Sequence, residues 1–198
     1  MDRKSLLRYM RYAAMAIMAM GTAYAVFYYV EKPWFPHPSL KNRDSIHQKT
    51  PYSPALPLEK KTVHLYFKNK DNFFLVAETH VLVCADDPIL LGKTILEMLI
   101  RGPGQGLAPT IPQHTGLRAF YIAEDGTAYV DLTENIQTDH PGGSTAEMIT
   151  LYSIVNSLVL NIPTVKQVKI LINGQESMTL AGHMDIRNPF KANMLMIK

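Results

Sequence analysis

The chain has 198 residues and a net charge of +3 at neutral pH, and it is 47% apolar but only 19% charged. This length allows one ordinary domain with appendages and excludes a large multidomain enzyme. The positive excess lies in residues 1–11, a basic stub that precedes an apolar run, whereas residues 59–198 hold 12 basic and 14 acidic residues. The larger part has no basic surface for phosphates, so we expect no nucleic-acid partner.

The N-terminal region predicts a membrane anchor. Residues 12–30 form an uncharged run of 19 residues, close to the roughly 20 that cross a bilayer as a helix. The basic stub should stay cytoplasmic, which gives a single-pass inner-membrane protein with a periplasmic or otherwise extracytoplasmic domain. A cleaved signal peptide is the alternative, because Ala23-Tyr24-Ala25 has the small-residue pattern of cleavage sites. The apolar run continues to Val30, which favours the anchor.

Residues 31–58 contain six prolines and show no sustained apolar period. Proline-rich chain of this kind is a semi-rigid spacer. The composition therefore predicts a linker that holds a folded domain, residues 59–198, away from the membrane.

The first half of this domain predicts two strands and a helix. Residues 62–67 alternate as a strand does, and a turn leads into a second strand over 73–83. Asp87 followed by Pro88 is typical of a helix start, and Gly102-Pro103 of its end. Cys84 lies in an apolar run, where we expect a small buried hydrophobe.

The second half predicts a hairpin of strands 117–123 and 127–132, a helix from Ser144 to about Asn161, and a strand over 165–172. Ser144-x-x-Glu147 has the form of a capping box. A short return strand near 178–180 completes the order β-β-α-β-β-α-β-(β). This order predicts an α+β fold with two helices packed on one face of a small mixed sheet.

Motifs that suggest nucleotide or metal chemistry do not fit their context. Gly92-Lys93-Thr94 resembles the end of a phosphate loop, but a proline and core leucines precede it. The seven histidines occur in no metal-ligand spacing. We therefore expect no cofactor, no metal site and no nucleotide.

Two further patterns invite a functional interpretation. Residues 139–144 precede a helix, and their amides suit an anion, although the capping box would already satisfy those amides. Asp131, Glu134 and Glu147 are the carboxylates nearest one another outside obvious turns, as hydrolysis by two carboxylates would need. We expect Asp131 to cap a strand end, Glu134 to be solvated and Glu147 to cap the helix.

The sequence from about residue 63 to 190 resembles the GerMN domain, the sporulation and spore germination domain of bacterial envelope proteins. The resemblance rests on the order and spacing of short motifs. These are Leu65-Tyr66-Phe67, Leu99-Ile100-Arg101-Gly102-Pro103, Ile111-Pro112-x-x-Thr115, Gly126-x-Ala128-x-Val130-Asp131-Leu132, Gly142-Gly143-Ser144-x-x-Glu147, Ile154-Val155-Asn156-Ser157-Leu158, Val165-x-x-Val168-x-Ile170-Leu171-Ile172-Asn173-Gly174 and Leu180-Ala181-Gly182-His183-Met184-Asp185.

The resemblance implies an extracytoplasmic, membrane-tethered or lipoprotein domain without established catalytic activity. It also implies a fold similar to the ring-building modules of secretion-like envelope assemblies. Sporulation members of the family can carry two copies and a lipid anchor, whereas this chain has one copy and a predicted membrane helix. The family supplies no catalytic residues, so its motif residues are expected to be turn glycines, caps and core. They are Gly102, Pro103, Pro112, Asp131, Gly143, Ser144, Glu147, Asn156, Gly174, Gly182 and His183.

These observations predict a non-catalytic interaction and assembly module whose partners are envelope proteins or further copies of itself. Apolar strand faces at an open sheet edge would form the contact surface. One alternative is a module that binds peptidoglycan or a small anionic ligand, which needs a concave site near residues 139–144. The other is a hydrolase that uses Asp131, Glu134 or Glu147. The role of residues 187–198, which either pack on the core or contact a neighbour, stays open.

Overall fold

The computed structural model describes residues 58–104 and 106–198. The predicted basic stub, membrane anchor and linker up to residue 57 lie outside the described residues. Among the helices of the described part, none is long and apolar enough to cross a membrane.

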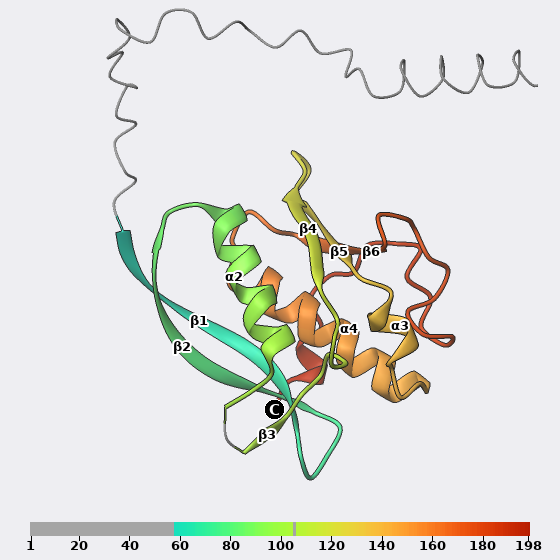
Figure 1. The fold of residues 1–198 in the computed structure, drawn as a ribbon. Coiled ribbons are helices and arrows are strands. Elements are labelled where there is room, and N and C mark those ends of the chain that lie inside the picture. Colours follow the sequence, from blue (N-terminus) through green and yellow to red (C-terminus); the bar gives the residue numbers. More distant parts are fainter. Residues whose placement is uncertain (1–57, 105) are drawn as a thin grey trace, which may run out of the picture. The chain divides into compact units, whose positions relative to one another are not determined.

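The described chain folds into two three-stranded sheets and two main helices, α2 and α4 (Figure 1). The sheets have the strand orders β2-β1-β3 and β4-β5-β6. The elements are β1 (Leu58–Asn69), β2 (Leu75–Ala85), α2 (Pro88–Arg101), β3 (Leu107–Ala108), β4 (Leu117–Ile122), β5 (Thr127–Leu132), α3 (Asn135–Thr138), α4 (Ser144–Val159), β6 (Gln167–Ile172) and a 3₁₀ turn (Met194–Met196).

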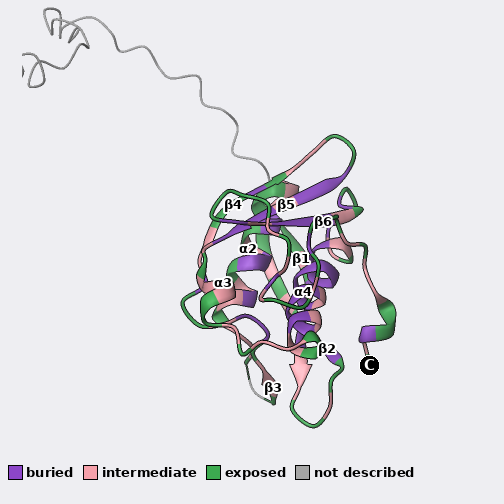
Figure 2. Cartoon of the chain, turned by 90° about the vertical axis from the view of Figure 1, so that its right-hand side faces the viewer, coloured by how far each residue is buried: buried purple, intermediate pink, exposed green. Residues whose placement is uncertain are grey.

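The prediction of one mixed sheet with both helices on one face is wrong, although the α+β class is confirmed. The β1–β2 ribbon forms its own sheet, and the second sheet combines an antiparallel β4–β5 pair with a parallel β5–β6 pair. Helix α2 packs against α4 and contacts β1, β2 and β4, while α4 contacts β1 and β6. Both helices therefore contribute to one core shared by the two sheets (Figure 2).

Local signals placed several elements correctly. The Asp87 carboxylate accepts hydrogen bonds from the Ile89 and Leu90 amides at 2.8 and 3.2 Å, as an N-cap does. Helix α2 then ends at Gly102, whose φ of +94° suits a residue without a side chain. Cys84 is buried, as its apolar context predicts.

Three local features differ from the prediction. The short elements β3 and α3 were not expected, because two to four residues give no periodic signal. The predicted return strand at 178–180 is also wrong. That segment makes only an isolated bridge between Thr179 and Asp185, and it buries Leu180 completely. The segment bends so that Leu180 packs in the core, and it does not extend along a neighbouring strand.

Polar side chains on one face of α4 explain why the β1–β2 ribbon is separate from the second sheet. The Ser153 hydroxyl donates to the Tyr66 carbonyl at 2.6 Å, and the Tyr66 amide donates to Ser157 Oγ at 3.0 Å. Just beyond the helix, the Asn161 amide group exchanges two hydrogen bonds with the backbone of His64, at 2.7 and 2.8 Å. Side chains of a helix thus bond the edge of β1 as a neighbouring strand would.

We predict that Ser153→Ala destabilises the fold by about 1–3 kcal/mol, because it leaves the buried Tyr66 carbonyl without its donor. Ser144→Ala on the same helix should change stability by less than about 0.5 kcal/mol, because that exposed side chain caps no amide. Guanidinium unfolding of both variants measures the difference. A larger effect of Ser144→Ala would indicate that Ser144 caps the helix, as in a capping box, and would contradict the structure.

Candidate functional site

Glu147, a motif residue in the first turn of α4, joins this helix to a loop near the C-terminus. Its side chain is fully buried, and its carboxylate accepts hydrogen bonds from the Ala181 and Met184 amides at 3.0 and 2.8 Å. The His183 amide also donates to it, at 3.1 Å, and His183 Nδ1 lies 2.8 Å from it. Glu147 therefore organises residues 181–184, a loop that is distant in sequence.

The predicted capping box is consequently wrong. No side chain caps α4, and the N-cap residue is Gly143 with a φ of +88°. The Glu147 side chain turns toward the loop because three backbone amides converge there, and buried amides need an acceptor. The same Ser-x-x-Glu spacing fits a local cap and a long-range anchor equally well.

The loop sets the acidity of Glu147. Burial by itself disfavours the charged carboxylate, but hydrogen bonds from Met184, Ala181 and His183 outweigh that penalty. The pKa of Glu147 falls from an ordinary 4.5 to about 2. The carboxylate is thus held ionised, which suits a structural anchor and not a general acid near neutral pH.

The other two candidate carboxylates belong to a different cluster. Asp131 accepts the Gly174 amide at 2.7 Å and pairs with the Arg118 guanidinium at 3.1 Å. It is the penultimate residue of β5, and its carboxylate holds the turn that follows β6, so the expected strand-end cap is found at the end of β6. Glu134 accepts a hydrogen bond from the Asn173 amide group at 3.3 Å. The structure thus brings Asp131 and Glu134 to one turn, while Glu147 bonds elsewhere.

Asn156 fixes the C-terminal segment, whose role the sequence left open. Its side chain is fully buried and exchanges two hydrogen bonds with the backbone of Asn193, at 2.9 and 3.1 Å. Phe190 pairs with Val168 of β6, and Ile197 makes a parallel bridge to Leu75 of β2. Residues 187–198 therefore pack on the core.

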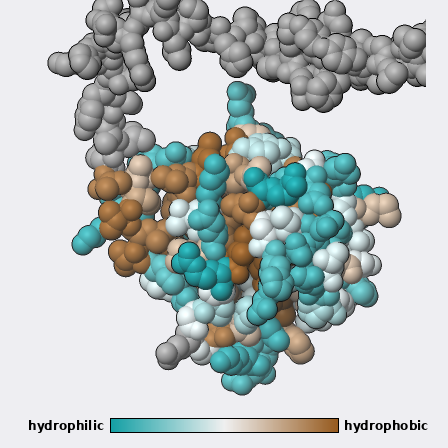
Figure 3. All heavy atoms as spheres, viewed as in Figure 1, coloured by the Kyte–Doolittle hydropathy of each residue, from teal (hydrophilic) through white to brown (hydrophobic). Residues whose placement is uncertain are grey.

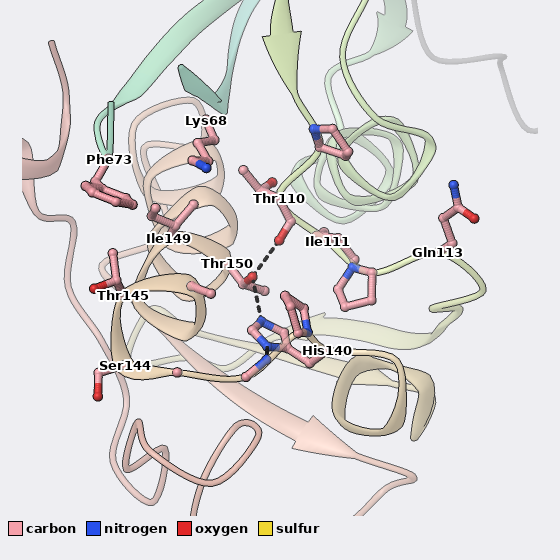
Figure 4. Close-up of a pocket in the computed structure, with 16 residues that line it drawn as sticks. Lys68, Phe73, Thr110, Ile111, Gln113, His140, Ser144, Thr145, Ile149 and Thr150 are labelled. Atoms are coloured by element: carbon pink, nitrogen blue, oxygen red, sulfur yellow. Dashed lines mark hydrogen bonds between the residues drawn. The ribbon is translucent and has the colours of Figure 1, made fainter. Parts of the chain in front are cut away.

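The loop that precedes α4 lines a pocket of about 660 Å³ (Figure 4). His140 lies in its wall, where Nδ1 accepts the Gly142 amide at 3.0 Å and Nε2 contacts the Thr150 hydroxyl at 3.0 Å. Burial lowers the pKa of His140, so the ring is neutral at pH 7. Pro112, one of the predicted motif residues, lines the same pocket. Residues 140–144 thus line a concave surface of the kind that ligand binding would need.

A second candidate surface is apolar and lies on β2, in the first sheet. β2 is the terminal strand of its sheet, and its outward side chains Val81 and Val83 are 64% and 61% exposed. Leu58 of β1, which pairs with Ala85 at the end of β2, is 69% exposed. Figure 3 shows apolar atoms gathered on this side of the molecule. We call Leu58, Val81 and Val83 the β2 patch.

The remaining motif residues have structural roles and form no phosphate or metal site among the described residues. Gly92 lies inside α2 against the Phe120 ring, so Gly92-Lys93-Thr94 is helix and not a phosphate loop. The described residues bring together no group of three His, Cys, Asp or Glu side chains suited to a metal. Turns and helix ends hold Gly102, Pro103, Gly143, Ser144, Gly174 and Gly182.

The fold and these contacts describe a small α+β domain built around helix α4. A family described as sporulation and spore germination, the Germane family, matches residues 64–177. The chain belongs to this family, as its motifs indicated. A search of curated proteins found no match.

Three solved structures are similar to this chain. A Clostridium perfringens protein described provisionally as a lipoprotein is 30% identical over 67% of this chain and 87% of its own, with a TM-score of 0.49. The first GerMN domain of the Bacillus subtilis sporulation protein GerM is 23% identical over 66% of this chain and 96% of its own, with a TM-score of 0.55. The tandem GerMN domains of that protein give 23% identity and a TM-score of 0.54, over 67% of this chain and 46% of theirs.

We predict that Glu147→Gln destabilises the domain by about 3 kcal/mol at pH 7, because it removes the charge to which three amides donate. The pKa of Glu147 is lower in the folded state, so its contribution is complete above about pH 4.5 and is lost as the pH falls toward 2. Unfolding curves of both proteins between pH 7 and 2.5 should therefore converge on acidification.

Asp185→Asn is the matched control. The Arg187 side chain lowers the pKa of Asp185 to about 2 as well, but this pair is exposed. Solvent screens exposed ion pairs, so the control should change stability little. An equal loss in the two variants would contradict the anchoring role of Glu147.

Proposed function

We propose that this protein is a membrane-anchored, extracytoplasmic interaction module of the bacterial envelope, and that it is not an enzyme. Membership of the sporulation and spore germination family supports an envelope role. The relatives described as a lipoprotein and as a sporulation protein support a place outside the cytoplasm. The apolar run 12–30 supplies the proposed anchor.

The exposed outer edge of β2 is the observation on which the interaction role rests. β2 pairs along its whole length with β1, and its other edge makes one bridge, from Leu75 to Ile197. In the described chain, residues 76–84 have no backbone partner on that edge. Exposed strand edges with apolar side chains accept a strand from another chain, and the β2 patch supplies those side chains.

The edge already pairs with a peptide segment at one end. The C-terminal Lys198 amide donates to the Leu75 carbonyl at 3.0 Å, next to the Ile197 bridge. A partner strand would continue this row of hydrogen bonds along β2. The partner is an envelope protein or a second copy of the chain, and the same edge serves either one.

The hydrolase alternative has less support. Glu147 and Asp131 are each held by two or more hydrogen bonds to backbone and side chains of this domain. A nucleophile or general acid must instead reach a substrate. The contacts of these carboxylates therefore favour a structural role.

We predict that a photoreactive benzoylphenylalanine at position 81 of the full-length protein cross-links to specific envelope proteins or to itself in living cells. The same group at Met178 is the control, because that side chain is 71% exposed but lies outside the β2 patch. Val83→Lys should reduce the adducts from position 81 several-fold, because a charged residue opposes strand pairing.

Val83 is largely exposed, so Val83→Lys should leave the thermal unfolding midpoint nearly unchanged. Equal adducts from positions 81 and 178 would contradict the proposed surface. So would adducts at position 81 that persist unchanged in Val83→Lys.

A further inference from the structure

The pocket beside the first turns of α4, which we call the α4 pocket, has the size of a small-molecule site. Its volume of about 660 Å³ falls within the range of roughly 300–1,000 Å³ found for ligand pockets. Three separate segments form it: the turn between β1 and β2, the loop before β4, and the loop and first turns of α4 (Figure 4). It lies apart from the β2 patch and plays no part in the proposed strand pairing.

The floor of the α4 pocket offers few hydrogen bonds because its polar groups bond to one another. The Thr150 hydroxyl donates to the Thr110 carbonyl, and the Thr110 hydroxyl pairs with Ser153 at 2.6 Å. Since Thr150 uses its proton in this way, His140 Nε2 carries the hydrogen that joins them, while Nδ1 accepts from Gly142. The floor therefore presents mainly apolar surface to a ligand.

The walls add apolar side chains and a single charge. Ile111, Ile149 and Phe73 supply hydrophobic contact area. Lys68 is the only ionised side chain among the lining residues, because His140 is neutral. The Lys68 ammonium lies 5.6 Å from the centre of the Phe73 ring and makes no ion pair with a carboxylate in the described part of the chain.

We propose that the α4 pocket binds a small organic acid with an apolar body and one carboxylate. The apolar body would fill the space between Ile111, Ile149 and Phe73, and the carboxylate would pair with Lys68. One carboxylate matches one ammonium, whereas a phosphate dianion would leave a negative charge without a partner in an apolar site. The first turn of α4, which no side chain caps, adds a favourable field for the same anion.

Photolabelling of the full-length protein in phosphatidylcholine nanodiscs tests this site. The probe is 4-phenylbutyrate with a trifluoromethyldiazirine on its ring, and labelled peptides are identified by mass spectrometry. Unlabelled 4-phenylbutyrate, 4-phenylbutanol and 4-phenylbutylamine then compete, so that the apolar body is constant and only the charge differs. We expect labels within 109–113 and 140–150. We also expect the acid to compete at about tenfold lower concentration than the alcohol, as one charge-assisted contact gives, and the amine to compete least.

Three variants locate the contacts. Lys68→Gln should abolish the advantage of the acid over the alcohol, whereas Lys70→Gln, an equal charge change on an exposed residue outside the pocket, should preserve it. Thr145→Trp places a large ring in the pocket from an exposed position and should remove labelling by the probe. Labels elsewhere, equal competition by acid and alcohol, or labelling that persists in Thr145→Trp would overturn the proposal. Cross-linking at position 81 is unaffected by any of these outcomes.

Discussion

Side chains of α4 satisfy main-chain groups that no strand or helix reaches, and the rest of the domain depends on this constraint. Ser153 and Ser157 bond the edge of β1, Glu147 bonds the loop 181–184, and Asn156 bonds the C-terminal segment. These side chains are buried among apolar neighbours, where an unpaired polar group costs about 1–3 kcal/mol. The helix therefore fixes one ribbon, one loop and one terminal segment around a single core.

The same constraint determines which surfaces stay open. α4 occupies the inner edge of β1, so strand pairing can extend the first sheet along β2, where the β2 patch lies. Glu147 turns toward the loop 181–184 and leaves the start of α4 without a side-chain cap, beside the α4 pocket. The proposed protein-binding edge and the proposed ligand pocket thus both depend on which main-chain groups the polar side chains of α4 bond.

The sequence predicted features that depend on neighbouring residues. Asp87 and Pro88 marked the start of α2, and the turn at Gly126 marked the β4–β5 hairpin, where a side chain would approach the Thr164 carbonyl to 2.9 Å. Features that join distant segments were not predictable. The Ser-x-x-Glu spacing at Glu147 fits a local helix cap as well as a bond to a distant loop. The positions of Ser153 and Ser157 in a helix do not indicate that they bond the backbone of a strand. The split into two sheets and the α4 pocket follow from these distant contacts.

Native-state hydrogen exchange tests most directly whether α4 holds these segments. The amides of Tyr66, His183, Met184 and Asn193 all donate to side chains of α4. If those bonds join the segments to the core, the four amides exchange only through global unfolding, with the same free energy as the central amides of α4. Exchange of the loop and tail amides through local opening, several kcal/mol below that of α4, would contradict the account.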